Sequence, residues 1–162
     1  MCIRDRPNLS FRAAAGGLAV AALSWLLGGR YCGAGMNVIA QAVEQGQALP
    51  WDFVCKALLT ALTLGAGFKG GEVVPSFFVG ACFGCIAGPL LGLPAGAAAA
   101  VGLVSVFCGA TNTPAASILL AVELFGGQGT ALCAIGCVLC FWLSGSHGLY
   151  EAQQFARPKL GE

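Results

Sequence analysis

The residues whose types and spacing could do chemistry lie in the segment 68–80, which reads FKGGEVVPSFFVG. Glu72 is the only charged residue between Lys69 and Glu123. A carboxylate at the head of such a long apolar run is costly, and ionisable groups in apolar surroundings mark functional sites. The group can alternate between a charged and a neutral form, so the chemistry it offers is proton exchange.

A helix is predicted to begin at this carboxylate. Gly70 and Gly71 let the backbone turn, and Pro75 is tolerated in the first helical turn. A helix start presents unpaired N–H groups and the positive end of the helix dipole. In a membrane such a start makes an anion site without a full positive charge. We therefore expect the N–H groups of the glutamate, Val73 and Val74 to hold an anion, with Gly71 allowing its approach.

The composition is that of an integral membrane protein. Of the 162 residues, 57% are hydrophobic and 9% are charged, against about 25% charged in soluble domains. The formal net charge of +1 indicates no nucleic-acid partner, and the lipid bilayer is the expected surrounding. The sequence offers no nucleophile–base pair, and the only histidine, His147, lies in a predicted loop. No enzyme activity, cofactor or metal site is predicted.

Nine cysteines lie mostly in apolar segments. Cys82 and Cys85 form one CxxC pair, and Cys137 and Cys140 form another. A CxxC pair is compatible with a redox or metal site. Because no His, Asp or Lys lies beside either pair, we interpret these cysteines as small packing residues.

The predicted elements are short helices broken by Gly and Pro. Several are shorter than the roughly 20 residues of a simple span, as in ion-binding membrane folds. Glycines at every fourth position predict a face for close helix packing: Gly80, Gly84, Gly88 and Gly92. The helices are predicted at 13–29, 33–47, 52–64, 75–91 with Pro89 interrupting, 95–107, 115–125, 130–143 and 149–156.

Several polar residues are given structural roles. We interpret Thr111, Asn112 and Thr113 as caps of the helix that opens at Pro114. Glu123, near the end of that helix, is expected to be structural or to lie at an interface.

The lysines are the other charges near the motif. Lys56 and Lys69 are expected in water-facing or interfacial positions, and the alternative is that they attract anions into a vestibule.

Three motifs in order resemble the CLC chloride channel and transporter family. The first is Gly70-Gly71-x-x-x-Pro75, the second is GATNTPAASILLAVELFG at 109–126, and the third is SGSHGLYEAQ at 144–153. The resemblance implies an all-α integral membrane fold, the C-terminal inverted-repeat half of a CLC-type protein, over residues 10–157. It also implies that Tyr150 faces the ion path. Residues 1–9 are interpreted as a non-native or flexible start, and 158–162 as a tail.

The resemblance also implies partners and a function. Ordinary members have an apolar residue where Glu72 stands, and GGEVVP resembles the fluoride/proton antiporter branch, in which this glutamate belongs to the transport path. We expect fluoride/proton antiport by a full-length parent, with a chloride channel or chloride/proton exchanger as the alternative. A structural membrane subunit and a CxxC redox or metal protein are alternatives of other classes.

The family's two N-terminal signatures are absent, so the missing N-terminal half is expected to complete the ion site. The family forms homodimers, and apolar faces on 13–27 and 115–138 could make that contact. The expected location is a bacterial-type plasma membrane.

Overall fold

A computed structural model describes residues 9–68, 71–127 and 129–145, with side chains from residue 13 onward. Within these ranges every regular element is helical and no strand is present, which agrees with the all-α prediction. The elements are α1 (Leu9–Leu26), α2 (Met36–Ala40) with a π-helical turn (Gln41–Gln45), α3 (Asp52–Gly65), α4 (Val73–Ala87), a 3-10 turn (Pro89–Leu91), α5 (Ala95–Thr111), α6 (Pro114–Phe125) and α7 (Thr130–Leu143).

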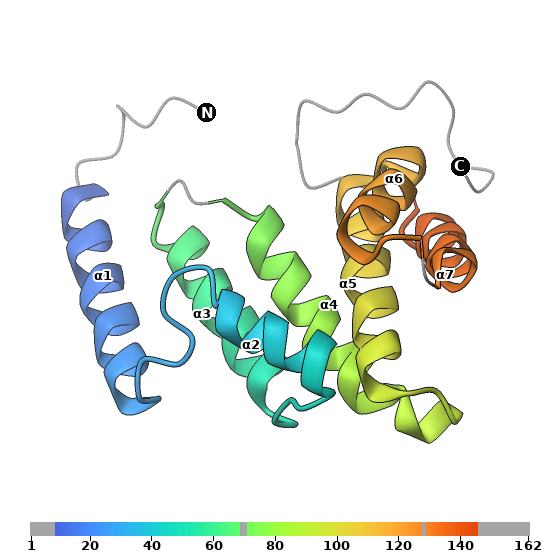
Figure 1. Cartoon of the computed structure of the whole chain (residues 1–162). Coiled ribbons are helices and arrows are strands. Elements are labelled where there is room, and N and C mark those ends of the chain that lie inside the picture. The colour runs from blue at the N-terminus through green and yellow to red at the C-terminus, as the bar shows by residue number, and fades with distance from the viewer. Residues whose placement is uncertain (1–8, 69–70, 128, 146–162) are drawn as a thin grey trace.

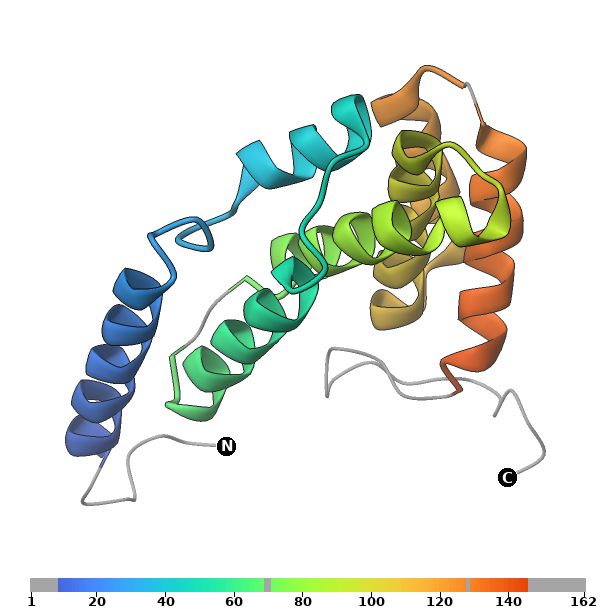
Figure 2. The same ribbon diagram turned by 90° about the horizontal axis from the view of Figure 1, so that it is seen from below.

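Helices α1, α3, α4 and α5 follow one another across the molecule in chain order (Figure 1). Helix α1 stands at one flank beside α3, and α4 lies between α3 and α5 (Figure 1). Helices α6 and α7 pack on the far side of α5, while α2 and its π-helical turn run across α4 and α5 (Figure 2). Because α3 and α4 are neighbours, the start of α4 packs beside α3.

Several predicted helix bounds differ from the structure. The helix predicted at 13–29 is Leu9–Leu26, and the one predicted at 33–47 is α2 with its π-helical turn. The predicted helix 75–91 ends at Ala87, and a 3-10 turn follows because Pro89 cannot continue the hydrogen-bond ladder. Gly92 ends that turn with a φ of 74° and has no atom within 4 Å of a Cβ built on it, so it lies outside the glycine packing face. Helix α5 runs past Gly109 to Thr111, where we had predicted a break.

The contact between α4 and α5 is made by backbone against backbone. A Cβ added at Gly80 would meet the carbonyl of Gly102, and one added at Gly84 would meet the carbonyl of Ala98. Gly88 faces the Ala98 side chain. Small residues therefore let the two helices approach closely, as in many helix pairs of membrane proteins.

Buried apolar side chains and thiols fill the space around this pair of helices. Phe78, Cys82 and Val104 are fully buried. Cys108 donates through its thiol to the Cys137 carbonyl at 3.3 Å, which joins α5 to α7. The described cysteines of both CxxC pairs thus lie in or at the helix contacts, packed among apolar neighbours.

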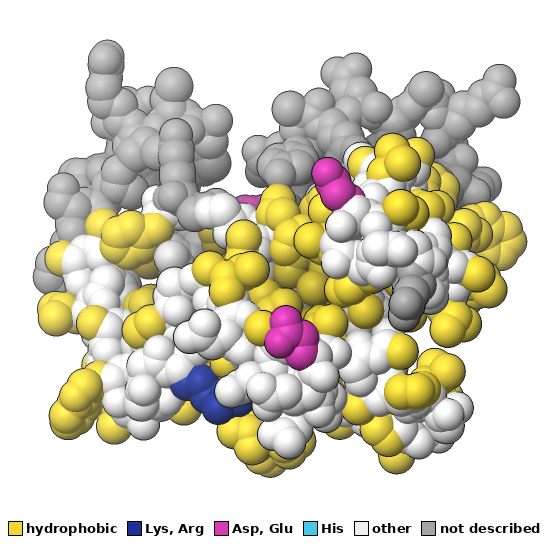
Figure 3. Space-filling view, in the orientation of Figure 1, with side chains coloured by type: hydrophobic (Ala, Val, Ile, Leu, Met, Phe, Trp, Pro, Cys, Tyr) yellow, Lys and Arg dark blue, Asp and Glu magenta, His cyan; other side chains and the backbone are white. Residues whose placement is uncertain are grey.

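Hydrophobic side chains also cover much of the surface, and the charged groups on one face are few and separate (Figure 3). Large apolar side chains are exposed on α1, α6 and α7, among them Trp25, Leu119 and Trp142. None of the helices in the described ranges combines the length and the hydropathy required to cross a bilayer.

Candidate anion site

Glu72 occupies the N-cap position of α4, with φ −86° and ψ −17°. Its carbonyl accepts the first helical hydrogen bond, from the N–H of Ser76 at 3.2 Å. No side chain caps this helix start among the described residues, and the Ser76 hydroxyl turns back to the Val73 carbonyl at 2.6 Å. The N–H groups of Val73 and Val74 therefore have the exposed-donor arrangement that a helix start offers to an anion.

The half-buried Glu72 lines a shallow, open cavity of about 350 Å³ between α3 and α4. Its neighbours on α4 are Pro75 and Ser76, and α3 contributes Thr60 and Leu64. The carboxylate thus lies at the start of a short helix and beside a space large enough for several waters.

A second, partly open cavity of about 490 Å³ lies between α1 and α3 and reaches the start of α4. It is lined on the α4 side by Gly71 and Pro75, which flank the glutamate. The two cavities share Thr60, Leu64 and Pro75 in their walls, so they adjoin.

Lys56 lines the larger cavity, and its position corrects the sequence-based expectation. We had predicted a water-facing or interfacial lysine, but the residue is 4% exposed. Its ammonium donates to the carbonyl of Tyr31 at 3.0 Å and to that of Gly33 at 2.6 Å. It also lies 5.2 Å from the centre of the Phe78 ring on α4, within the range of a cation–π contact. The buried charge is tolerated because carbonyl dipoles and an aromatic face replace water.

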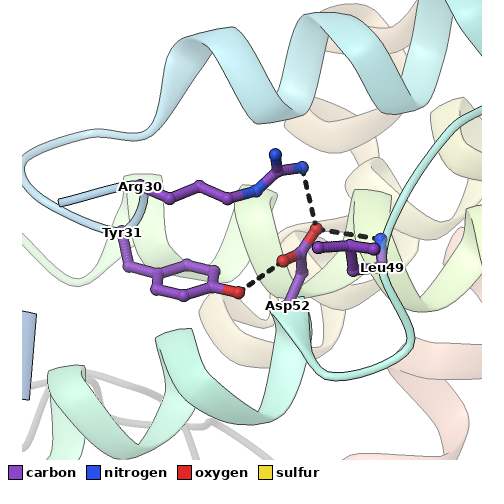
Figure 4. Close-up of polar contacts among 4 residues, drawn as sticks. All are labelled: Arg30, Tyr31, Leu49 and Asp52. Carbon is purple, nitrogen blue, oxygen red and sulfur yellow. Dashed lines mark hydrogen bonds and ion pairs between the residues drawn. The ribbon is translucent and has the colours of Figure 1, made fainter. Parts of the chain in front are cut away.

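Asp52, one helical turn before this lysine, is fully buried and has three donors around its carboxylate. The Tyr31 hydroxyl donates at 2.6 Å, the Leu49 N–H at 3.0 Å and the Arg30 guanidinium at 3.3 Å (Figure 4). Figure 4 shows the carboxylate pointing between the tyrosine ring and the guanidinium, both of which come from the chain after α1. A buried carboxylate with this many donors is satisfied.

These contacts fasten the segment 28–35 to α3. Tyr31 takes part twice, because its hydroxyl binds Asp52 and its carbonyl accepts from Lys56. The segment carries glycines in left-handed conformation at 28, 29, 33 and 35, so it forms no regular helix that could satisfy its own carbonyls. Lys56 donates to two of these carbonyls, and Asp52 accepts from the side chains of Arg30 and Tyr31. Lys56 and its two carbonyl partners thereby shape one wall of the larger cavity.

Sequence reasoning missed this group of residues, although one signal was present. Asp52 and Lys56 are four positions apart in an otherwise uncharged helix, so their side chains project from one face. Two charges on one face of an apolar helix indicate a polar partner segment. The identity of that segment, 21 to 25 residues earlier, depends on the fold.

The polar turn before α6 also differs from its prediction. The structure has no side-chain cap at Thr113, although Pro114 occupies the first turn as expected. Thr111 still belongs to α5, and Asn112 adopts a left-handed conformation with φ 58° at the end of that helix. The Asn112 amide donates to the Gly145 carbonyl at 3.3 Å, so this residue joins the ends of α5 and α7 instead of capping α6. The Thr111 hydroxyl lies 2.8 Å from the Phe107 carbonyl and 2.7 Å from the Thr113 hydroxyl, so the two threonines also have partners other than the start of α6.

Several predicted site residues lie outside the described ranges. These are Lys69, Gly70, His147 and Tyr150. The expectation that Tyr150 faces the ion path therefore stays a prediction. Glu123 is described, and it is exposed near the end of α6.

Comparisons with known proteins place the chain in a family. Residues 3–145 match the family model described as voltage-gated chloride channel. The chain is similar to the chloride/fluoride channel protein of Pseudomonas syringae pv. tomato, with 44% identity over 155 residues, covering 91% of this chain and 34% of that protein. An uncharacterized protein of Methanocaldococcus jannaschii is 30% identical over 100 residues, covering 62% of this chain and 25% of that protein.

The chain thus spans about a third and a quarter of the length of these two relatives, less than the half that the motif resemblance implied. The family match extends over nearly all the described helices, including the start of α4 with its glutamate. On this evidence the chain belongs to the voltage-gated chloride channel family, whose members are all-helical integral membrane proteins.

Proposed function

We propose that the full-length protein carries small anions across a membrane, and that it does so as a fluoride/proton antiporter. The observation that carries the proposal is Glu72 at the start of α4, a carboxylate placed beside backbone donors. An anion at this helix start would meet the N–H groups of Val73 and Val74 together with the Glu72 carboxyl, which is able to exchange a proton.

The chemistry of the carboxyl group favours fluoride as the partner. When protonated, the carboxyl donates a hydrogen bond, and fluoride is a small, strongly hydrated ion that needs strong donors in place of water. When ionised, the same group repels the anion, because like charges in a low-dielectric site cannot both be held. Alternation between the two forms would couple the movement of a proton to that of an anion.

The comparisons support transport of small anions more directly than they support the coupling of that transport to protons. The Pseudomonas syringae relative is named for both chloride and fluoride, and the family description is that of a chloride channel. Chloride conduction or chloride/proton exchange is therefore the second candidate. A bacterial-type plasma membrane and a homodimer go with either function, and the exposed apolar side chains of α6 and α7 would suit such a contact.

The test is Glu72→Gln in the full-length protein. Glutamine keeps the size of the side chain and can donate a hydrogen bond, but it cannot release a proton. Fluoride efflux and proton uptake are measured together in liposomes across a range of pH. We expect proton uptake per fluoride to fall at least about tenfold, a conservative figure beside the roughly 10²- to 10⁴-fold that a positioned proton-transfer group contributes to a rate.

The matched control is Glu44→Gln, the same chemical change at an exposed carboxylate of the π-helical turn. This variant should keep the wild-type ratio of protons to fluoride. If Glu72→Gln also keeps that ratio and the wild-type pH profile, Glu72 has no part in coupling, and chloride passage becomes the better function.

A further inference from the structure

The two charged residues of α3 are neutralised to different degrees. Within the described ranges the one ion pair joins Arg30 to Asp52, so the carboxylate has a cation beside it. Lys56 has no carboxylate within ion-pair distance in the same part of the chain; its hydrogen bonds go to two backbone carbonyls. Carbonyl dipoles make a buried ammonium tolerable but leave its net charge in place. The buried lysine is therefore a source of positive potential.

Lys56, which carries this charge, is one of the residues that line the larger cavity. The residues that accept its hydrogen bonds, Tyr31 and Gly33, line the same cavity, so the ammonium is held at the cavity wall. Lys56 is the one charged residue among the described residues that line this space. Cavities with low-dielectric walls concentrate the field of such a charge and raise the local concentration of the opposite ion.

The other polar side chains of the residues that line the cavity are hydrogen-bonded within the protein: the Ser24 hydroxyl pairs with the Cys32 thiol at 2.6 Å, and the Tyr31 hydroxyl donates to Asp52. The Thr60 hydroxyl donates to the carbonyl of Lys56 at 2.8 Å, and the Thr63 hydroxyl donates to that of Leu59 at 2.7 Å. Their hydrogen atoms are therefore directed into α3 and not into the cavity. The remaining wall is mostly apolar, with Val20, Leu59 and Leu64 among its residues.

These features select the charge and size of the occupant. One cation in apolar walls suits a monovalent ion, because a multiply charged anion would leave charge uncompensated in an apolar space. A cavity of about 490 Å³ has room for a halide that keeps part of its water shell. We propose that Lys56 and the cavity between α1 and α3 form an accessory site for a monovalent halide, next to the start of α4.

The accessory site rests on the anion passage proposed above. It adds a second halide-binding position to the proposed path. Gly71 and Pro75, which flank Glu72 in the sequence, line this cavity, and Glu72 itself lines the adjoining one, so a halide held there lies beside the candidate site. A halide in this position waits close to the helix start, which raises occupancy of the path at low anion concentration.

The test is bromide bound to crystals of the full-length protein, located by its anomalous scattering. Three variants accompany the wild type. Lys56→Gln removes the charge but keeps N–H donors for the Tyr31 and Gly33 carbonyls, and Lys56→Arg keeps the charge. Ala21→Phe fills the cavity from α1 and leaves the lysine and its hydrogen bonds in place.

We expect a bromide peak in the cavity of the wild type and of Lys56→Arg, and none in Lys56→Gln or Ala21→Phe. In efflux assays the halide concentration for half-maximal rate should rise about tenfold in Lys56→Gln, at the low end of what a focused charge supplies. If Lys56→Gln does not fold, the Ala21→Phe crystal decides the matter.

A wild-type cavity without bromide, or a peak that persists in Lys56→Gln, would overturn the accessory site. Neither result touches the proposed antiport, which depends on the proton-to-fluoride ratio of Glu72→Gln. Conversely, an unchanged ratio in that variant together with a lysine-dependent bromide peak would remove the antiport and keep the site.

Discussion

Two helix contacts in this chain are built in opposite ways. Helices α4 and α5 meet through glycines, with backbone against backbone and no charged group at the contact. Helix α3 meets the segment 28–35 through a fully buried carboxylate, a buried ammonium and a tyrosine. The contact between α4 and α5 depends on glycines, which have no side chain to separate the backbones. The contact between α3 and the segment 28–35 depends on polar groups that pair with one another. Each is therefore sensitive to a different kind of substitution.

The largest effect is expected where the backbones are closest. Gly84→Ala places a methyl group against the Ala98 carbonyl, which is backbone and cannot turn aside, so α4 and α5 must separate. We expect a loss of about 3 kcal/mol in the free energy of unfolding, at the upper end for overpacked sites. The measurement is thermal or denaturant unfolding of the full-length protein in detergent.

Gly65→Ala is the matched control for this substitution. Gly65 is the last residue of α3, and a Cβ built there meets no atom within 4 Å. The change should be neutral or stabilise by up to about 1 kcal/mol, because alanine loses less backbone entropy on folding. Equal destabilisation by both variants would show that the close approach of α4 and α5 is not what Gly84 provides.

A smaller effect is expected at the polar contact. Asp52→Asn keeps the shape of the side chain but removes the charge that attracts the Tyr31 hydroxyl and the Arg30 guanidinium. We expect a loss of about 2 kcal/mol, the range for hydrogen bonds to a charged group. Tyr31→Phe, which removes the hydroxyl alone, completes a double-mutant cycle.

The cycle should give a coupling energy of about 1 kcal/mol or more between positions 31 and 52, because the two groups share a buried hydrogen bond. Strictly additive losses would mean that the tyrosine and the carboxylate act independently. The contrast with the glycine contact would then weaken, since the polar groups would no longer form a matched set.

The two contacts also differ in how far the sequence predicts them. Glycines at positions 80, 84 and 88 are adjacent on one helix, so local spacing is enough to predict a packing face. Asp52 and Lys56 are also four positions apart on one helix. Their partners, however, lie in a glycine-rich segment before α2 that has no periodic sequence pattern. The start of α4 was predictable from Gly71, Glu72 and Pro75 because helix starts have local chemical signals.

Helix ends that depend on distant partners were harder to predict. The extension of α5 to Thr111 goes with a left-handed Asn112 whose amide binds Gly145, 33 residues later. By contrast, α7 begins and ends where predicted, at Thr130 and Leu143, because glycines precede and follow it in the sequence. The bounds of α7, set by local breakers, were thus predictable, and the end of α5, which goes with a tertiary contact, was not.

The smallest effect tests a polar group inside the apolar region. The Ser105 hydroxyl on α5 is buried against Gly136 of α7 and has no hydrogen-bond partner among the described residues. Ser117 on α6 is also buried, but its hydroxyl donates to the Thr113 carbonyl at 2.8 Å. Ser105→Ala should leave stability unchanged or raise it by about 1 kcal/mol, because it removes an unsatisfied group, whereas Ser117→Ala should lower it by a similar amount. Unfolding of both variants under the same conditions distinguishes the cases. If Ser105→Ala were the more harmful of the two, this hydroxyl would have a partner in the full-length protein, and the helix contacts around α5 would depend on matched polar groups just as the contact of α3 does.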